Sequence, residues 1–227
     1  MVSGDNRTYH QYDNNSFILP KEVLRIIEGV PDFSKHPERD SLIIEIGWET
    51  GGRITEVLNL KPKNVMEDSI AMITEKQKLK PGKKQPRIWP PIRIVYASPD
   101  LCNWIRKYCD QENIGPEDWI FPSIHDKKKI LGRGQIHKMI TEASEHAKVF
   151  RLGKANPRTG GRYKGISYHV LRHSYAVYML RKTNSVKTVQ KQLGHASINS
   201  TNAYADIAYD DVRVNVAKAG IHLYHPS

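Results

Sequence analysis

Two histidines lie four residues apart in the stretch ISYHVLRHSYA, with an arginine between them. On a helix, His169 and His173 would share one face, which is the spacing of a pair of zinc ligands. The zinc protease pattern also needs a glutamate directly after the first histidine as general base, and Val170 stands there. No third ligand at a suitable spacing is evident, so we expect no metal. The pair alone is typical of two histidines that pack within a helix.

Arg172, between the two histidines, suits a phosphate better. Its guanidinium is a planar fork of donors that matches two non-bridging phosphate oxygens and stays charged at any working pH. Arg53 follows two glycines in TGGRITE, at a predicted helix start where backbone donors also favour an anion. In LGHASINSTNAY, His195 follows a helix-ending glycine and Tyr204 comes nine residues later. Each residue alone is typical of packing or of a surface turn, but together they indicate a phosphate site.

The charge of the chain favours a polyanionic partner. Its 227 residues include 35 Lys and Arg against 24 Asp and Glu, a formal net charge of +11, which suggests double-stranded DNA. Two segments concentrate the positive charge: residues 75–93 and the Gly- and Pro-containing segment 148–164. We expect both to face DNA phosphates, through the residues Lys83, Lys84, Arg87, Arg151, Lys154, Arg158, Arg162 and Lys164.

The elements that must position these residues are mostly helices. Apolar periodicity and capping residues predict helices over 20–29, 39–52, 53–60, 98–113, 134–150, 167–183, 185–195, 197–207 and 209–220. Two extended segments around a Pro-Gly turn, between residues 64 and 95, predict a β-hairpin with a basic tip, and 148–164 is predicted to be a loop. The expected fold class is α+β, mostly α-helical, with a small antiparallel hairpin.

The domain boundaries follow from composition. Residues 1–16 are polar and lack apolar periodicity, so we expect a flexible arm, then one domain over 17–208 and a C-terminal helix or tail over 209–227. No apolar run approaches the roughly 18 residues that span a bilayer, so we expect a cytoplasmic protein with no membrane partner. Cys102 and Cys109, seven apart on one predicted helix, are about 10.5 Å apart, too far for a disulfide, and are expected in the core.

Three of these segments together resemble a known family. TGGRITEVLNL, YHVLRHSYA and LGHASINSTNAY resemble, in order and spacing, the signature segments of the tyrosine recombinase (phage integrase) family, and the resemblance extends from about Phe17 to Asp206. It implies the fold of that family's catalytic domain. The site residues that it implies are Arg53 and Arg172 on the phosphate, Glu56 as the acid of the first segment, His169 and His195 as hydrogen-bonding partners, His173 in support, Tyr204 as nucleophile, and a hairpin lysine, favoured as Lys78 with Lys76 and Lys80 as alternatives.

The resemblance also implies an activity. Such a site would cut and rejoin DNA through a covalent 3′-phosphotyrosyl intermediate, with no metal, ATP or other cofactor, in a homo-tetramer on two DNA sites. The C-terminal segment 209–227 would then be exchanged between subunits. Only a short arm precedes Pro20, so we expect either a minimal enzyme or a fragment without an N-terminal clamp domain, assisted by an accessory DNA-binding protein. A type IB topoisomerase-like strand transferase and a non-catalytic DNA-binding relative remain the alternatives.

Overall fold

The computed structural model describes residues 17–73, 92–152, 163–195, 201–202 and 204. These residues form α1 (Pro20–Gly29), α2 (Pro37–Thr50), α3 (Ile54–Leu58), α4 (Pro99–Gln111), α5 (Arg133–His146), α6 (Tyr168–Thr183) and α7 (Val186–Leu193), with the 3-10 turns η1 (Val30–Asp32) and η2 (Pro62–Asn64). The strands are β1 (Ser69–Ile73), β2 (Ile92–Tyr96), β3 (Arg151–Leu152) and β4 (Tyr163–Lys164). The predicted fold class, mostly helical with a small antiparallel sheet, is confirmed.

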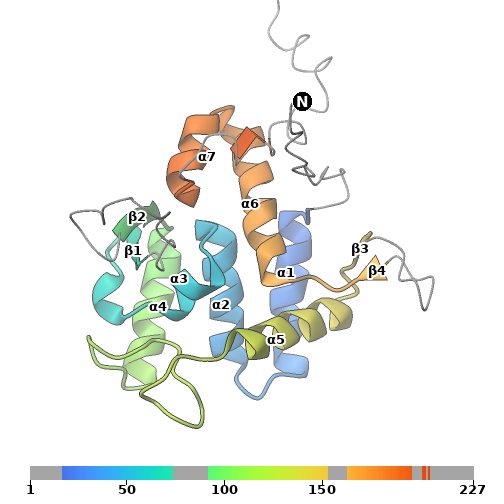
Figure 1. Ribbon diagram of the computed structural model, residues 1–227. Coiled ribbons are helices and arrows are strands. Elements are labelled where there is room, and N and C mark those ends of the chain that lie inside the picture. The colour runs from blue at the N-terminus through green and yellow to red at the C-terminus, as the bar shows by residue number, and fades with distance from the viewer. Residues whose placement is uncertain (1–16, 74–91, 153–162, 196–200, 203, 205–227) are drawn as a thin grey trace, which may run out of the picture.

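Helix α2 forms the centre of the fold. Its side chains Leu42, Ile43, Ile44 and Ile46 are all fully buried, as expected for a helix that is covered on every side. Helix α4 packs on one side of α2 and α6 on another, while α5 crosses below and contacts α1 (Figure 1). The long, rigid helices α2 and α6 therefore carry the segments on which the candidate site is built.

The chain leaves α2 through a glycine that the packing requires. Gly51 has a φ of 59°, in the left-handed region, and closes the helix. A Cβ at this position would lie 2.6 Å from the ring of Tyr175 and 2.7 Å from the side chain of Leu193. Glycine thus lets the turn lie directly on α6 and α7, and the turn delivers Arg53 to the first position before α3.

The predicted hairpin is present in its two strands. β1 and β2 pair antiparallel, with Ile70 opposite Val95 and Met72 opposite Arg93. Alternate residues of β2 point outward, and Ile92, Ile94 and Tyr96 remain more than half exposed. The predicted basic tip, with the candidate lysines Lys76, Lys78 and Lys80 and the DNA-binding candidates Lys83, Lys84 and Arg87, lies outside the described residues.

The segment 148–164 departs from the loop prediction at its two flanks. Arg151 pairs with Lys164 and Leu152 with Tyr163 in a second two-stranded antiparallel sheet. The prediction was wrong at these positions because a two-residue strand is too short to show the alternation that identifies a strand. Lys154, Arg158 and Arg162 lie between the strands, outside the described residues, and only the backbone of Arg151 and Lys164 is described.

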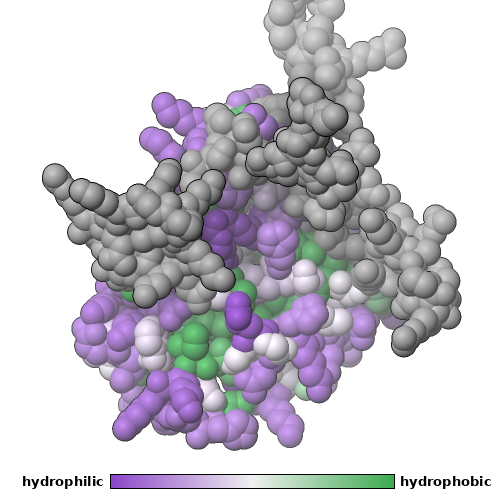
Figure 2. Space-filling model, viewed as in Figure 1, coloured by the Kyte–Doolittle hydropathy of each residue, from purple (hydrophilic) through white to green (hydrophobic). Residues whose placement is uncertain are grey.

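Cys102 and Cys109 are buried free thiols, as predicted. On the face of the molecule seen in Figure 2, hydrophilic residues form most of the described rim and hydrophobic ones gather near the centre. Among the helices that the structure describes, none is both long and apolar enough to cross a bilayer. The predicted arm 1–16 and tail 209–227 lie outside the described residues.

Candidate active site

Arg53 is held in place by a buried carboxylate. The Glu56 side chain is fully buried and accepts hydrogen bonds from the Arg53 backbone N–H at 2.8 Å and from Arg53 Nη1 at 3.0 Å. The Arg53 side chain is 38% exposed, so part of the guanidinium is available to a ligand. The backbone N–H of Arg53 is occupied by Glu56, so this N–H is not one of the donors open to an anion.

Glu56 is ionised because its attraction to two arginines outweighs the effect of its burial on the pKa. Burial alone would raise the pKa of this carboxyl, but the hydrogen bond and charge of Arg93, followed by those of Arg53, hold it below its ordinary value. Arg93 Nη2 lies 2.6 Å from Glu56 Oε2. The carboxylate therefore fixes two arginines while neutralising only one charge.

Arg172 connects two turns of the chain beneath the site. It lies in α6, is 3% exposed, and donates from Nη1 to the carbonyl of Gly51 and from Nη2 to the carbonyl of Leu193 at 2.8 Å. Burial, followed by the charge of Arg53, lowers the pKa of Arg172 to about 10, so the guanidinium is still charged at neutral pH. Arg172 thus joins the segment that carries Arg53 to the segment that carries His195.

Tyr204 packs between two histidines. It is 5% exposed, and its ring lies 4.9 Å from the ring of His173 and 6.1 Å from that of His195, on which it stacks at 19°. His195 is fixed from its other side, because its Nδ1 lies 2.9 Å from Oγ1 of the buried Thr201. The tyrosine ring is therefore held beside His195 and next to the helix that carries Arg172.

His195 is neutral in this setting. Burial, followed by the positive charges of Arg172, Arg53 and Arg93, lowers its pKa to about 4. A neutral imidazole offers one donor and one acceptor nitrogen. With Nδ1 directed at Thr201, the other ring nitrogen is available for a hydrogen bond to a ligand oxygen or to the tyrosine.

The structure thus brings together Arg53, Glu56, Arg172, His195 and Tyr204, and it places His173 in contact with Tyr204. His169 is exposed in the first turn of α6, three residues before Arg172.

Arg93, Gln192 and Thr201 were not identified as site residues from the sequence. Arg93 contributed only to the basic segment in that prediction, and its alternation with Ile92 and Ile94 would have placed the two isoleucines, rather than the arginine, on the buried face of the strand. Gln192 and Thr201 lack any local pattern, since their partners Tyr96 and His195 become neighbours only through the fold or through a turn.

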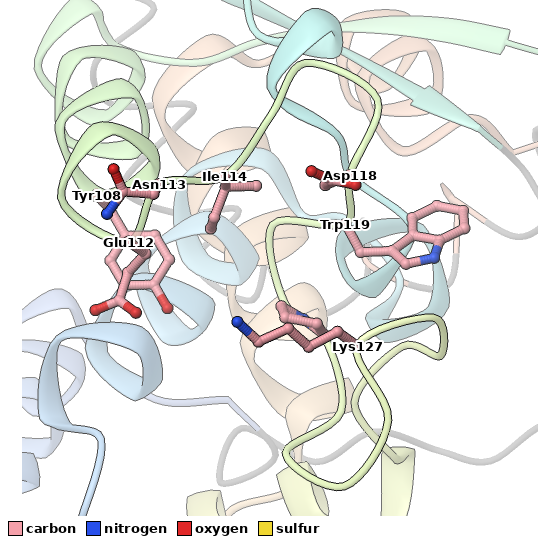
Figure 3. Close-up of a pocket in the computed structure, with 8 residues that line it drawn as sticks. Tyr108, Glu112, Asn113, Ile114, Asp118, Trp119 and Lys127 are labelled. Carbon is pink, nitrogen blue, oxygen red and sulfur yellow. The ribbon is translucent and has the colours of Figure 1, made fainter.

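A separate pocket of about 230 Å³ lies near the C-terminal end of α4 and contains none of these residues. Figure 3 shows Tyr108 and Glu112 on one wall and Trp119 and Lys127 on the other. Its charges are mixed, so it does not share the cationic character of the site around Arg172. Within the described ranges, no three His, Cys, Asp or Glu side chains are grouped so as to hold a metal.

Comparison with known proteins identifies the family. The model of the phage integrase family matches residues 16–211, and the chain therefore belongs to that family. It is 27% identical over 84% of its length to a tyrosine recombinase of Pseudothermotoga lettingae, and 27% identical over 93% to the tyrosine recombinase XerD of Chlamydia trachomatis, covering 56% and 62% of those proteins.

Solved structures share the fold. The crystal structure of XerA recombinase matches with a TM-score of 0.65 at 23% identity, over 92% of this chain and 66% of that one. XerH site-specific recombinase in a post-cleavage complex with DNA matches with a TM-score of 0.65 at 21% identity, over 90% of this chain and 52% of that one. The chain spans between 53% and 60% of the length of three curated relatives, those of Pseudothermotoga lettingae, Thermosipho africanus and Sinorhizobium fredii.

Proposed function

We propose that the chain is the catalytic part of a site-specific DNA recombinase that cuts and rejoins strands through Tyr204. The observation that carries the proposal is the packing of Tyr204 on His195 and His173, next to the helix that carries Arg172. A DNA-binding role alone would not need a tyrosine enclosed by histidines at a buried arginine. Membership in the phage integrase family supports the same activity.

The charges of the site suit attack on a phosphodiester. Arg53 and Arg172 would bind the non-bridging oxygens and stabilise the negative charge that grows in the transition state. His195, neutral and oriented by Thr201, would donate a hydrogen bond to the same phosphate. The Tyr204 oxygen would attack phosphorus, with His169 able to accept the phenol proton, and would form the 3′-phosphotyrosyl bond while the 5′ oxygen leaves.

The departing 5′ oxygen needs a proton, and we assign that role to Lys78, with Lys76 and Lys80 as alternatives. The step is reversible because the phosphotyrosyl bond keeps the energy of the phosphodiester. A 5′ hydroxyl of another strand can then take the phosphate. Repeated on two DNA sites, this chemistry gives strand exchange by a homo-tetramer, and segment 209–227 is proposed to pack on a neighbouring subunit.

A nicked suicide DNA substrate tests the proposal. Loss of the short 5′ fragment prevents religation, so the wild-type protein should accumulate on the DNA as a covalent complex that survives denaturing electrophoresis. Tyr204→Phe should bind DNA within about threefold of the wild type and give no such complex, because the ring remains and only the nucleophilic oxygen is lost. The absence of a complex with the wild type on DNA that it binds would contradict the proposal.

A second assay separates the alternatives. A type IB topoisomerase-like enzyme would relax supercoiled DNA without joining two sites, whereas a recombinase exchanges strands between two linear duplexes. A non-catalytic relative would do neither and would retain only DNA binding. The similarity to tyrosine recombinases favours strand exchange between two duplexes.

A further inference from the structure

Arg93 is a largely buried arginine on a strand whose other side is exposed. It lies in β2 between Ile92 and Ile94, which are 54% and 58% exposed, yet its own side chain is 13% exposed. Because side chains alternate along a strand, Arg93 points away from the exposed face, toward α3 and α7. An arginine that gives up most of its hydration needs several fixed acceptors in return.

The first acceptor is the carboxylate that holds Arg53. Arg93 Nη2 lies 2.6 Å from Glu56 Oε2, and Nε lies 3.4 Å from Oε1. The same carboxylate accepts both the backbone N–H and the Nη1 of Arg53. Arg93 therefore acts on Arg53 through a shared, fully buried partner, and a change in the position of Arg93 would be transmitted to the phosphate-facing guanidinium.

The second acceptor lies in the turn that presents His195. Arg93 Nη1 donates to the carbonyl of Gln192, in the last turn of α7. The Gln192 side chain in turn donates to the Tyr96 carbonyl at 2.9 Å and accepts from the Tyr96 N–H at 3.2 Å. The end of α7 is thus fastened to β2 at two points, one of which is Arg93.

The stem of Arg93 also shapes this turn. A Cβ at Gly194 would lie 2.5 Å from Cδ of Arg93, so the arginine packs directly on the backbone between Leu193 and His195. Gly194 has a φ of 63°, which supplies the turn that directs His195 back toward Tyr204. The residue directly after this turn is His195, whose imidazole is neutral in the site.

We propose that Arg93 is a positioning residue that holds Arg53, through Glu56, and the His195 turn as one rigid unit. The consequence for catalysis rests on the proposed function, whereas the geometry itself does not. The guanidinium reaches acceptors in two different elements through two separate nitrogens, whereas a lysine donates from one nitrogen, so Arg93→Lys should keep one contact and lose the other.

The alternative is that Arg93 only stabilises the fold, and a matched variant separates the two. Arg39 forms a similar buried pair, with Nη2 at 2.7 Å from Asp40 Oδ1 and a side chain that is 14% exposed. It lies in the first turn of α2, about 18 Å along the helix from Gly51. Arg39→Met should therefore cost stability as Arg93→Met does, without affecting the site.

The first measurement uses the DNA-free protein and does not depend on activity. Proton NMR of His195, assigned by its loss in His195→Gln, reports its pKa. Arg172, Arg53, Arg93, Glu56 and Tyr204 surround this imidazole. Arg93→Met should raise the pKa of His195 toward 6.5, because a cation is lost and the turn is released. Arg93→Lys should give an intermediate value, and Arg39→Met should leave it unchanged.

The second measurement is the rate of covalent complex formation at saturating suicide substrate. Arg93→Met should lower this rate by roughly 10- to 100-fold, the scale of an angstrom-sized misplacement. DNA affinity should stay within about threefold, because a residue that is 13% exposed makes little contact with phosphates. Arg93→Lys should recover part of the rate, and Arg39→Met should match the wild type.

Each outcome decides the proposal. An unchanged pKa of His195 in Arg93→Met, or equal losses of rate in Arg39→Met and Arg93→Met, would overturn it. If Arg93→Met fails to fold, Arg93→Lys keeps a cation beside Glu56, and the same two measurements on that variant decide. If the wild type forms no covalent complex, the proposed function fails, while the pKa measurement still tests Arg93.

Discussion

At the scale of single residues, the site contains more positive charges than carboxylates to neutralise them. Arg53, Arg93 and Arg172 lie around one ionised carboxylate, Glu56. Burial lowers the pKa of His195, and the surplus charge lowers it further while also attracting a phosphate. The charges that would bind DNA thus act with burial to hold the imidazole in the neutral form that can donate or accept a hydrogen bond.

The lowered pKa of His195 predicts a specific dependence of stability on pH. The pKa of His195 is about 4 in the folded protein against an ordinary 6.5, so the unfolded chain binds more protons between these values. The contribution of His195 to the free energy of unfolding is therefore fully present above pH 6.5 and is lost as pH falls toward 4. In His195→Gln, which keeps a polar group beside Thr201, this loss should be absent.

Urea denaturation of the wild type and of His195→Gln from pH 7.5 to 4 checks this prediction. The measured quantity is the difference between their free energies of unfolding at each pH. The pKa of Glu45 is raised to about 7 by burial and then by Glu49, and it titrates in both proteins, so it cancels in the comparison. Parallel stability curves would show that His195 is not held neutral by the fold.

The residues of the site differ in how far the sequence could predict them. Arg53, Arg172, His195 and Tyr204 were identified because family motifs place them within short segments. Arg93 was not, since its partners Glu56 and Gln192 are 37 and 99 residues away and only the fold brings them together. A basic residue in a basic segment carries no local sign that it is buried.

At the scale of elements, the C-terminal turn of α7 both packs against Arg93 and positions His195. Gly194 closes the helix in the left-handed conformation, and the Arg93 stem occupies the space that a side chain would need. Gly194→Ala should lower the free energy of unfolding by about 2 kcal/mol or more, through backbone strain and displacement of Arg93.

The chain supplies a matched control for this substitution. Gly134, in the first turn of α5, is exposed and a Cβ there would meet nothing within 4 Å. Gly134→Ala should be neutral or stabilising by up to about 1 kcal/mol, because alanine favours the helix. Chemical denaturation of both variants measures the difference; equal effects at the two positions would mean that the α7 turn tolerates a side chain.

Elements were predictable in proportion to their length. The helices α1, α4 and α7 show clear apolar periodicity, and α4 and α7 also begin at a serine cap, such as Ser98, whose hydroxyl accepts from the Leu101 N–H at 3.1 Å. The strands β3 and β4 have two residues each and offered no such pattern. Trp104 on α4 is only partly buried, and its indole N–H donates to Glu38 at 3.3 Å.

At the scale of the whole molecule, the net charge of +11 must act through its placement. The segments 75–93 and 148–164 lie in the sequence between the site residues Arg53 and Arg172. Lys127, Lys128 and Lys129 lie in the loop after α4, where Lys127 lines the separate pocket. If DNA lies over the site, we expect the segments 75–93 and 148–164 to contact phosphates and Lys127–Lys129 not to contact them.

Salt dependence of DNA affinity distinguishes these groups. Each phosphate contact contributes about 0.9 to the slope of log affinity against log salt concentration. The triple variant Lys83→Gln, Lys84→Gln and Arg87→Gln should reduce that slope by about 3 and weaken binding to all sequences alike. Replacing Lys127, Lys128 and Lys129 by glutamine removes the same charge and should leave the slope within about 1 of the wild type. Equal reductions would show that DNA responds to net charge alone and is not oriented over the site by the hairpin.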